Sequence, residues 1–129
     1  MPRDQPATPY DLCERAFLFA CRVVKLSARI ESRRGSATRV AWQLTKCGTS
    51  VGANLQEAKS ASSRADFLAK QEIALREARE AWFWLRIVRA CELAQGNDIE
   101  RLLDEANEIV AILVSSTRTI KSSMVRSRK

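Results

Sequence analysis

Gly48, Ser50 and Gly52 form the pattern G-x-S-x-G, which in one large class of hydrolases presents a nucleophilic serine on a sharp turn. That turn joins a strand to a helix, whereas the apolar residues from Val40 to Leu55 keep a helical spacing straight through this segment. The chain also contains no histidine that could act as the base for Ser50. The sequence therefore argues against a catalytic serine, and we expect Ser50 to be a packing or hydrogen-bonding residue.

The absence of histidine removes several kinds of catalytic and metal site together. A Ser-His-Asp triad, a Cys-His pair, an H-E-x-x-H zinc site and an E-x-x-H di-iron site all need at least one imidazole. The four cysteines have no C-x-x-C spacing, and we expect them to be small buried hydrophobes in a reducing compartment. These cysteines are Cys13, Cys21, Cys47 and Cys91.

Three carboxylates, Glu72, Glu77 and Glu80, lie close together in the sequence, and acid–base or metal chemistry is one interpretation of them. Glu72 precedes Arg76 by four residues, which is the favourable order for an ion pair on a helix surface. A solvated helix face is therefore the favoured interpretation. We assign no catalytic residue, no metal site and no cofactor, and we expect a protein that is not an enzyme.

Small residues make the G-x-S-x-G segment informative in another way. Gly48 and Gly52 are four residues apart, with Ala53 beside the second glycine. Such a surface lets another helix approach closely, although each glycine inside a helix costs about 1 kcal/mol relative to alanine. Asn54 and Glu57 are the polar residues expected to take part in the same packing or oligomer contact.

The consecutive aromatic residues Trp82, Phe83 and Trp84 span about 200° of a helix surface, so they cannot all face one core. If Trp82 and Leu85 face inward, Phe83 lies partly outside, beside Arg86. Exposed aromatics next to arginine are typical of partner surfaces. Together with the glycine segment, Phe83 and Trp84 indicate self-association.

Basic residues outnumber acidic ones by 22 to 15, which gives a formal charge of +7. This excess favours polyanionic partners such as RNA or DNA, because each Lys or Arg can neutralise a phosphate without reading sequence. Basic residues gather along the first predicted helix and at the end of the chain. The candidate nucleic-acid-binding residues are Arg22, Lys25, Arg29, Arg33, Arg34, Lys121, Arg126, Arg128 and Lys129.

An alternative explanation for these charges is internal pairing. In an antiparallel bundle the basic end of the first helix lies near the start of the last one, where Glu100, Asp104 and Glu105 are available. Basic residues at the end of the last helix also complement its dipole. Both interpretations stay open for the first helix, and polyanion binding is favoured for the tail.

The elements that position these residues are four amphipathic helices separated by short breaks. Gly35-Ser36, a capping box from Ser63 to Asp66, and Gly96-Asn97-Asp98 mark the breaks. Short connections between long helices favour an all-α, antiparallel, up-down-up-down four-helix bundle in one domain. The expected ranges are a flexible N-terminus at 1–8, helices at about 9–34, 37–60, 64–95 and 98–125, and a basic tail at 126–129.

One apolar stripe of the first helix is expected to face the core. No run approaches the roughly 18 apolar residues of a membrane span, and the first residues lack the apolar part of a secretion signal. We therefore expect a cytoplasmic protein with no membrane partner. The residues expected to be buried by the first helix are Cys13, Phe17, Ala20, Val24, Ser27 and Ile30.

Three ordered motifs resemble a known family. They are S-V-G-A-N-x-x-E-A from Ser50, D-F-x-x-K from Asp66, and A-L-R-E-A-x-E-x-x-x-W-L from Ala74. They are similar to the core of the bacterial four-helix bundle proteins encoded in 23S rRNA intervening sequences, also called S23-like proteins. The family-pattern positions are Ser50, Gly52, Asn54, Glu57, Phe67, Lys70, Glu77 and Trp84.

The resemblance implies a four-helix bundle that assembles as a homopentamer. It also implies kinship with the accessory variability proteins of diversity-generating retroelements, which bind a reverse transcriptase and nucleic acid. The expected function is therefore a non-enzymatic, oligomeric bundle that binds RNA or DNA, with a reverse transcriptase as a candidate partner. The alternative is a protein-interaction scaffold with no nucleic-acid role, in which charge serves solubility.

Overall fold

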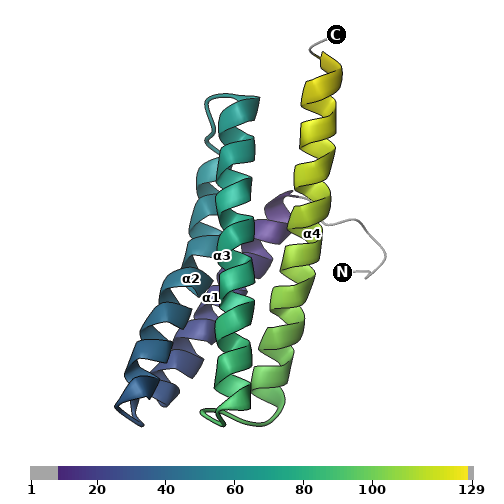
Figure 1. The fold of residues 1–129 in the computed structure, drawn as a ribbon. Coiled ribbons are helices and arrows are strands. Elements are labelled where there is room, and N and C mark those ends of the chain that lie inside the picture. Colours follow the sequence, from purple (N-terminus) through teal and green to yellow (C-terminus); the bar gives the residue numbers. More distant parts are fainter. Residues whose placement is uncertain (1–8, 128–129) are drawn as a thin grey trace.

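A computed structural model of the chain describes the backbone of residues 9–127 and the side chains of residues 12–127 (Figure 1). This part of the chain contains four α-helices and no strand. None of these helices has an apolar stretch long enough to cross a membrane. The expected flexible N-terminus, Arg128 and Lys129 lie outside the described residues. The helices are α1 (Pro9–Glu31), α2 (Ser36–Ala58), α3 (Arg64–Ala90) and α4 (Asn97–Ser127).

Each helix packs against the next one in the chain, and α1 and α4 also touch, but more sparsely. The α1–α2 and α3–α4 connections lie at one end of the molecule, and the α2–α3 connection lies at the other (Figure 1). The C-terminal part of α4 leans away from the other helices and extends past them. The seam between α1 and α4 is thus the most open one in the bundle.

Two helices end three or more residues earlier than expected, α1 at residue 31 rather than 34 and α3 at residue 90 rather than 95. The reason is local backbone geometry, because Arg34, Gly35 and Glu92 have φ values of 62°, 66° and 56°. These left-handed conformations cannot continue a right-handed helix. The N-cap position of α2 is Gly35, so no side chain makes a capping hydrogen bond there.

The expected cap of α3 is confirmed. The Ser63 hydroxyl accepts a hydrogen bond from the backbone N–H of Asp66 at 3.0 Å. The Asp66 carboxylate in turn accepts from the backbone N–H of Ser62 at 3.0 Å, one residue earlier than in the standard capping box. Together the two bonds fix the point at which the chain enters α3.

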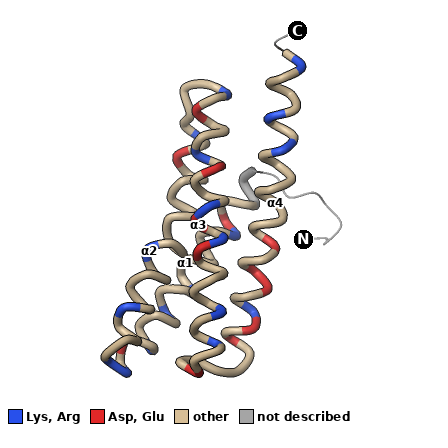
Figure 2. Tube along the Cα trace, viewed as in Figure 1, with Lys and Arg blue, Asp and Glu red and all other residues tan. Residues whose placement is uncertain are grey.

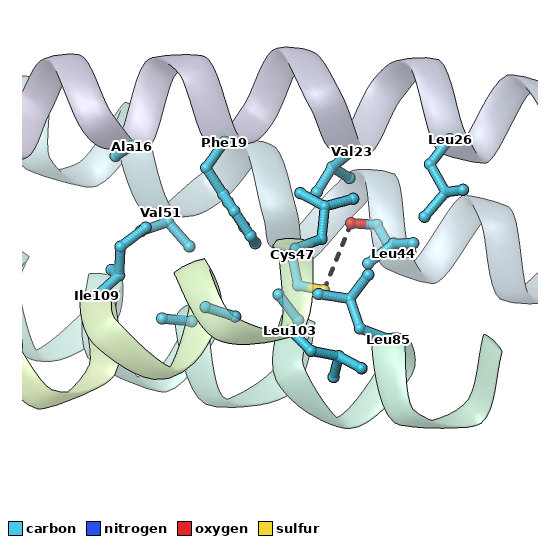
Figure 3. Packing of buried hydrophobic residues seen from close by; sticks show 14 of the residues in the cluster. Ala16, Phe19, Val23, Leu26, Leu44, Cys47, Val51, Leu85, Leu103 and Ile109 are labelled. Atoms are coloured by element: carbon cyan, nitrogen blue, oxygen red, sulfur yellow. Dashed lines mark hydrogen bonds between the residues drawn. The ribbon is translucent and has the colours of Figure 1, made fainter. Parts of the chain in front are cut away.

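The core is a single cluster of apolar side chains from all four helices. Figure 3 shows Phe19 and Val23 of α1 directed toward Cys47 and Val51 of α2 and Ile109 of α4. All five side chains are almost completely buried. This shared core fixes how each helix is rotated, and therefore which charged residues face each groove.

The prediction of which α1 side chains are buried is largely wrong. Phe17 and Val24 are exposed, while only Ser27 and Ile30 of the expected stripe are buried. Two lines of apolar residues run along α1, and the line that was not predicted is the buried one. Its Ala16 and Val23 pack against Gly52 and Gly48 of α2. The buried line consists of Leu12, Ala16, Phe19, Val23, Leu26 and Ile30.

Candidate nucleic-acid interface

Part of the basic stripe on α1 is neutralised across the seam with α4. Arg15 contacts the carboxylates of Glu105 and Glu108, each at 2.5 Å, and Arg29 contacts Asp98 at 3.2 Å. The hydrogen bonds that the Arg15 guanidinium donates to the Glu105 carboxylate raise the pKa of Arg15. Internal pairing therefore accounts for Arg15 and Arg29. Glu105 takes part in it as expected, whereas Glu100 pairs with Arg89 of α3.

The remaining cations of α1 line a groove with α4, and this α1–α4 groove has a volume of about 570 Å³. Arg22 and Lys25 lie in it beside Arg29, facing Arg101 of α4. Asp98 is the only acidic residue in the lining, and it is already paired with Arg29. Within residues 12–127, Arg22, Lys25 and Arg101 have no ion-pair partner.

Arg101 was not among the candidates from the sequence. Its position three residues after Asp98 places both on one face of α4, and that face meets α1. A helical projection of α4 could have found it, once Asp98 was assigned to the α1 side. The floor between the cations is apolar and includes Leu26 and Leu102. The groove therefore combines three uncompensated positive charges with a hydrophobic base.

Arg33 and Arg34 have a different environment from the groove residues. The Arg33 guanidinium donates a hydrogen bond at 2.6 Å to the backbone carbonyl oxygen of Glu92. This bond ties the α1–α2 connection to the residues that follow α3. Arg34 is exposed and adopts the left-handed conformation that ends the turn. Arg33 thus has a structural contact, and neither Arg33 nor Arg34 lines the α1–α4 groove.

The tail candidates form a separate basic region. Lys121 and Arg126 lie in the exposed last turns of α4, about 30 Å along the helix from Arg101 for Lys121, given a rise of about 1.5 Å per residue. Figure 2 shows acidic residues along the first half of α4 and basic residues along its last turns. Lys121 contacts the Glu72 carboxylate at 3.5 Å. No ion pair joins Glu72 to Arg76 among the described residues, so the expected pair is wrong.

The glycine segment packs against α1 of the same chain. A Cβ atom at Gly48 would lie 2.7 Å from Cγ1 of Val23, so no side chain fits there without movement. At Gly52 the nearest atom is the Ala16 carbonyl carbon at 3.4 Å, an ordinary contact distance. The close helix approach attributed to these glycines occurs within the bundle, between α1 and α2.

Ser50 lies in the middle of α2, far from any strand or turn of the nucleophile-elbow kind. Its hydroxyl donates to the Lys46 carbonyl oxygen at 2.7 Å, and the Asn54 amide donates to the Ser50 carbonyl oxygen at 2.8 Å. These bonds run along α2 itself. Glu57 is exposed on the same helix.

Phe83 is 48% exposed, as the aromatic spacing predicts. Its ring meets Trp84 edge-on, with centroids 5.3 Å apart. Trp84 is half-buried, and its indole N–H is buried without a hydrogen-bond partner among the described residues. Arg86 lies over the ring of Trp82 at 4.8 Å. Each of the three aromatic side chains thus makes a contact on α3 itself, Phe83 with Trp84 and Trp82 with Arg86.

Of the four free cysteines, only Cys47 is buried, and burial raises its pKa to about 12. Cys13 and Cys21 are half-buried and Cys91 is exposed, so the expectation of four buried cysteines is wrong. Cys13 and Cys21 do not belong to the buried line of α1, and Cys91 follows the last residue of α3. Across the described residues, no group of three or more Cys, Asp or Glu side chains could hold a metal ion.

Comparison with known proteins identifies the class to which this bundle belongs. The sequence model of the 23S rRNA-intervening sequence protein family matches residues 9–115, and the chain belongs to that family. The structure is similar to the crystal structure of a protein of unknown function from the S23 ribosomal protein family of Bacteroides thetaiotaomicron VPI-5482. That match has 32% identity and a TM-score of 0.77, and covers 85% of this chain and 97% of the other. Comparison with curated proteins found no match.

Proposed function

We propose that the chain is a non-enzymatic, oligomeric bundle of antiparallel, up-down-up-down helices that binds nucleic acid in the cytoplasm. In this proposal it serves as an accessory factor to a retroelement reverse transcriptase. The observation that carries the nucleic-acid part is the α1–α4 groove, where Arg22, Lys25 and Arg101 face one another without acidic partners. Uncompensated Lys and Arg side chains supply the attraction for phosphates that sequence-independent binding needs.

The salt dependence of binding tests this proposal. For duplex DNA, each neutralised phosphate contributes about 0.9 to the slope of log K against log salt. We expect the variant Arg22→Gln/Lys25→Gln to bind a duplex more weakly at low salt, with a slope smaller by about 1.8. The measurement is fluorescence anisotropy at several salt concentrations.

The matched control is Arg39→Gln/Lys46→Gln, which removes the same charge from exposed positions on α2. If the control lowers the slope as much as the groove variant does, net charge rather than the groove carries binding. If the wild-type chain shows no salt-dependent binding at all, the nucleic-acid proposal fails.

Self-association as a homopentamer is the second part of the proposal. An apolar line on the outer side of α1 supports it, since Phe17, Leu18 and Val24 are all at least 45% exposed. Phe17 and Val24 are seven residues apart, which places them on one helix face. A contiguous exposed apolar face of this kind is typical of a protein interface. Among the candidate oligomer residues, Phe83 and Trp84 offer a second apolar surface on α3.

A protein-interaction scaffold is the alternative function, and one observation favours it. Phe83 is exposed and lines a pocket with Arg86 and Arg89, so an aromatic anchor lies beside two cations. A protein that stays on the immobilised chain after nuclease treatment, and is lost with Phe83→Ser, would support this function. Loss of all bound protein on nuclease treatment would favour nucleic-acid binding instead.

A further inference from the structure

A second basic groove lies on the other side of α4, between α3 and α4. This α3–α4 groove has a volume of about 640 Å³. Arg76 and Arg79 of α3 and Arg118 and Lys121 of α4 line it. Each pair is separated by three residues, so each presents two like charges on one helix face.

The charges of the α3–α4 groove are poorly compensated. Glu72 is the only acidic residue in the lining, and its carboxylate contacts Lys121 at 3.5 Å. Arg76, Arg79 and Arg118 have no ion-pair partner within residues 12–127. Neighbouring like charges on a helix are destabilising, so a bound anion would relieve a repulsion that the chain itself leaves in place.

The lining also contains a polar group without a partner. Thr117 is only 6% exposed, and its hydroxyl has no hydrogen-bond partner among the described residues. A buried hydroxyl without a hydrogen bond is unfavourable, and Thr side chains in helices populate two rotamers. Leu75 and Val114 supply the apolar part of the lining. A hydroxyl that turns toward the groove would find its partner in an anionic ligand.

We propose that the α3–α4 groove binds phosphate groups, with Arg76, Arg79 and Arg118 as the cationic ligands and Thr117 as a hydroxyl donor. The planar guanidinium group matches the geometry of phosphate oxygens and donates two parallel hydrogen bonds to them. The phosphates come from a polynucleotide backbone or from a free polyphosphate, which share this chemistry. The inference does not rest on the α1–α4 groove, because different side chains line the two grooves.

Calorimetric titration with tripolyphosphate at constant ionic strength tests the proposal on the full chain. We expect Arg79→Gln/Arg118→Gln to weaken binding at least tenfold. The matched charge control, Arg39→Gln/Lys46→Gln at exposed positions on α2, is expected to change it less than twofold. Absence of binding to the wild-type chain, or equal losses in both variants, would overturn the proposal.

Melting temperature and the affinity of a Thr117 variant separate a binding role of these residues from a structural role. The Arg79→Gln/Arg118→Gln variant should melt no lower than wild type at low salt, since the change removes a repulsion. Thr117→Val should weaken tripolyphosphate binding several-fold without lowering the melting temperature. Unchanged affinity in Thr117→Val would remove the hydroxyl from the site.

Competition identifies the source of the phosphates. Displacement of tripolyphosphate by single-stranded polyuridylate supports the polynucleotide backbone, and failure to displace it supports a free polyphosphate. The outcome is distinguishable from that of the α1–α4 groove. If the Arg22→Gln/Lys25→Gln variant keeps the full salt slope while tripolyphosphate binding still depends on Arg79 and Arg118, the first proposal fails and this one stands.

Discussion

Two glycines of one sequence motif meet different surroundings on the same neighbouring helix. A Cβ atom at Gly48 would press on Val23, which is completely buried and β-branched and therefore has little room to turn away. A Cβ atom at Gly52 would meet Ala16 at ordinary contact distances. The motif thus contains one sterically required glycine and one glycine that alanine could replace.

We expect Gly48→Ala and Gly52→Ala to change stability in opposite directions. Alanine gains about 1 kcal/mol of helix propensity at either site, but overpacking costs about 1–3 kcal/mol at Gly48. Gly48→Ala should therefore lower the free energy of unfolding by up to about 2 kcal/mol, and Gly52→Ala should raise it by up to about 1 kcal/mol. Urea denaturation of both variants measures these changes.

The double variant Gly48→Ala/Val23→Ala provides the control for the clash. It should lose less stability than the two single changes added together, because shortening Val23 makes room for the new methyl group. Additive effects would mean that Val23 is not the obstacle. A bulky residue is different, and Gly52→Leu is expected to disrupt the packing of α1 on α2.

Cys47 is expected to make the free energy of unfolding depend on pH in the alkaline range. Burial raises its pKa from 9.0 to about 12, so the folded chain holds this proton more tightly than the unfolded chain does. The stabilisation is fully present below pH 9 and is lost as the pH rises toward 12.

Substitution of Cys47 tests this pH dependence. The free energy of unfolding of the wild-type chain should fall more steeply between pH 9 and 12 than that of Cys47→Ala. Other titrating groups act in both proteins, so the difference between the two curves isolates Cys47. Parallel curves would contradict the raised pKa.

At the scale of the helices, the cap of α3 can be tested directly. Ser63→Ala removes the acceptor for the Asp66 N–H and should cost about 1 kcal/mol of stability. The adjacent Ser62→Ala is the control, because the Ser62 hydroxyl is at a longer 3.4 Å from the Asp66 carboxylate. Thermal denaturation should give a lower melting temperature for Ser63→Ala only. Equal losses would assign the stability to the turn as a whole.

The helices themselves could be predicted from the sequence, but the rotation of α1 could not. Periodicity located all four helices, and the family resemblance agreed with them. On α1, however, both apolar lines have helical spacing, and packing against the other helices, including the contacts of Val23 and Ala16 with the α2 glycines, decides which line is buried. Long-range packing of this kind leaves no signal in the spacing of one helix.

The same limit applied to the candidate interface. The sequence predicted basic residues on α1, but their partners depend on which face of α4 meets them. Arg15 and Arg29 form ion pairs with carboxylates of α4, while Arg22 lies in the same groove as Arg101. Net charge could be counted from composition alone. Which charges remain uncompensated could be known only once the two helices were placed side by side.

For the molecule as a whole, the basic regions are divided rather than continuous. The acidic residues Asp104, Glu105 and Glu108 of α4 separate Arg101, in the α1–α4 groove, from the basic last turns of α4 (Figure 2). A polyanion that reached both would have to pass around this acidic segment or bridge neighbouring copies. The assembly state therefore bears directly on how nucleic acid could be bound.

Light scattering of the purified chain tests the assembly. We expect a mass of about five times the 14.5 kDa of one chain. Phe17→Glu should lower that mass, because it places a charge in the exposed apolar line of α1. Trp42→Glu is the matched control, since Trp42 is 61% exposed on α2. A monomer in the wild type, or equal effects of both changes, would contradict self-association through α1.

The two halves of α4 differ in how many helices they contact, and this difference affects which part of the protein unfolds locally first. All hydrogen bonds and ion pairs described from α4 to α1 lie at or before Glu108, and those beyond it, such as Ser116 to Gln71 and Arg64 to Ser123, go to α3. Segments with one packed neighbour open at lower free energy than the core does. Backbone amides near the end of α4, which forms one wall of the α3–α4 groove, should therefore exchange with solvent before those of the core. A ligand there would slow that exchange before it changed global unfolding.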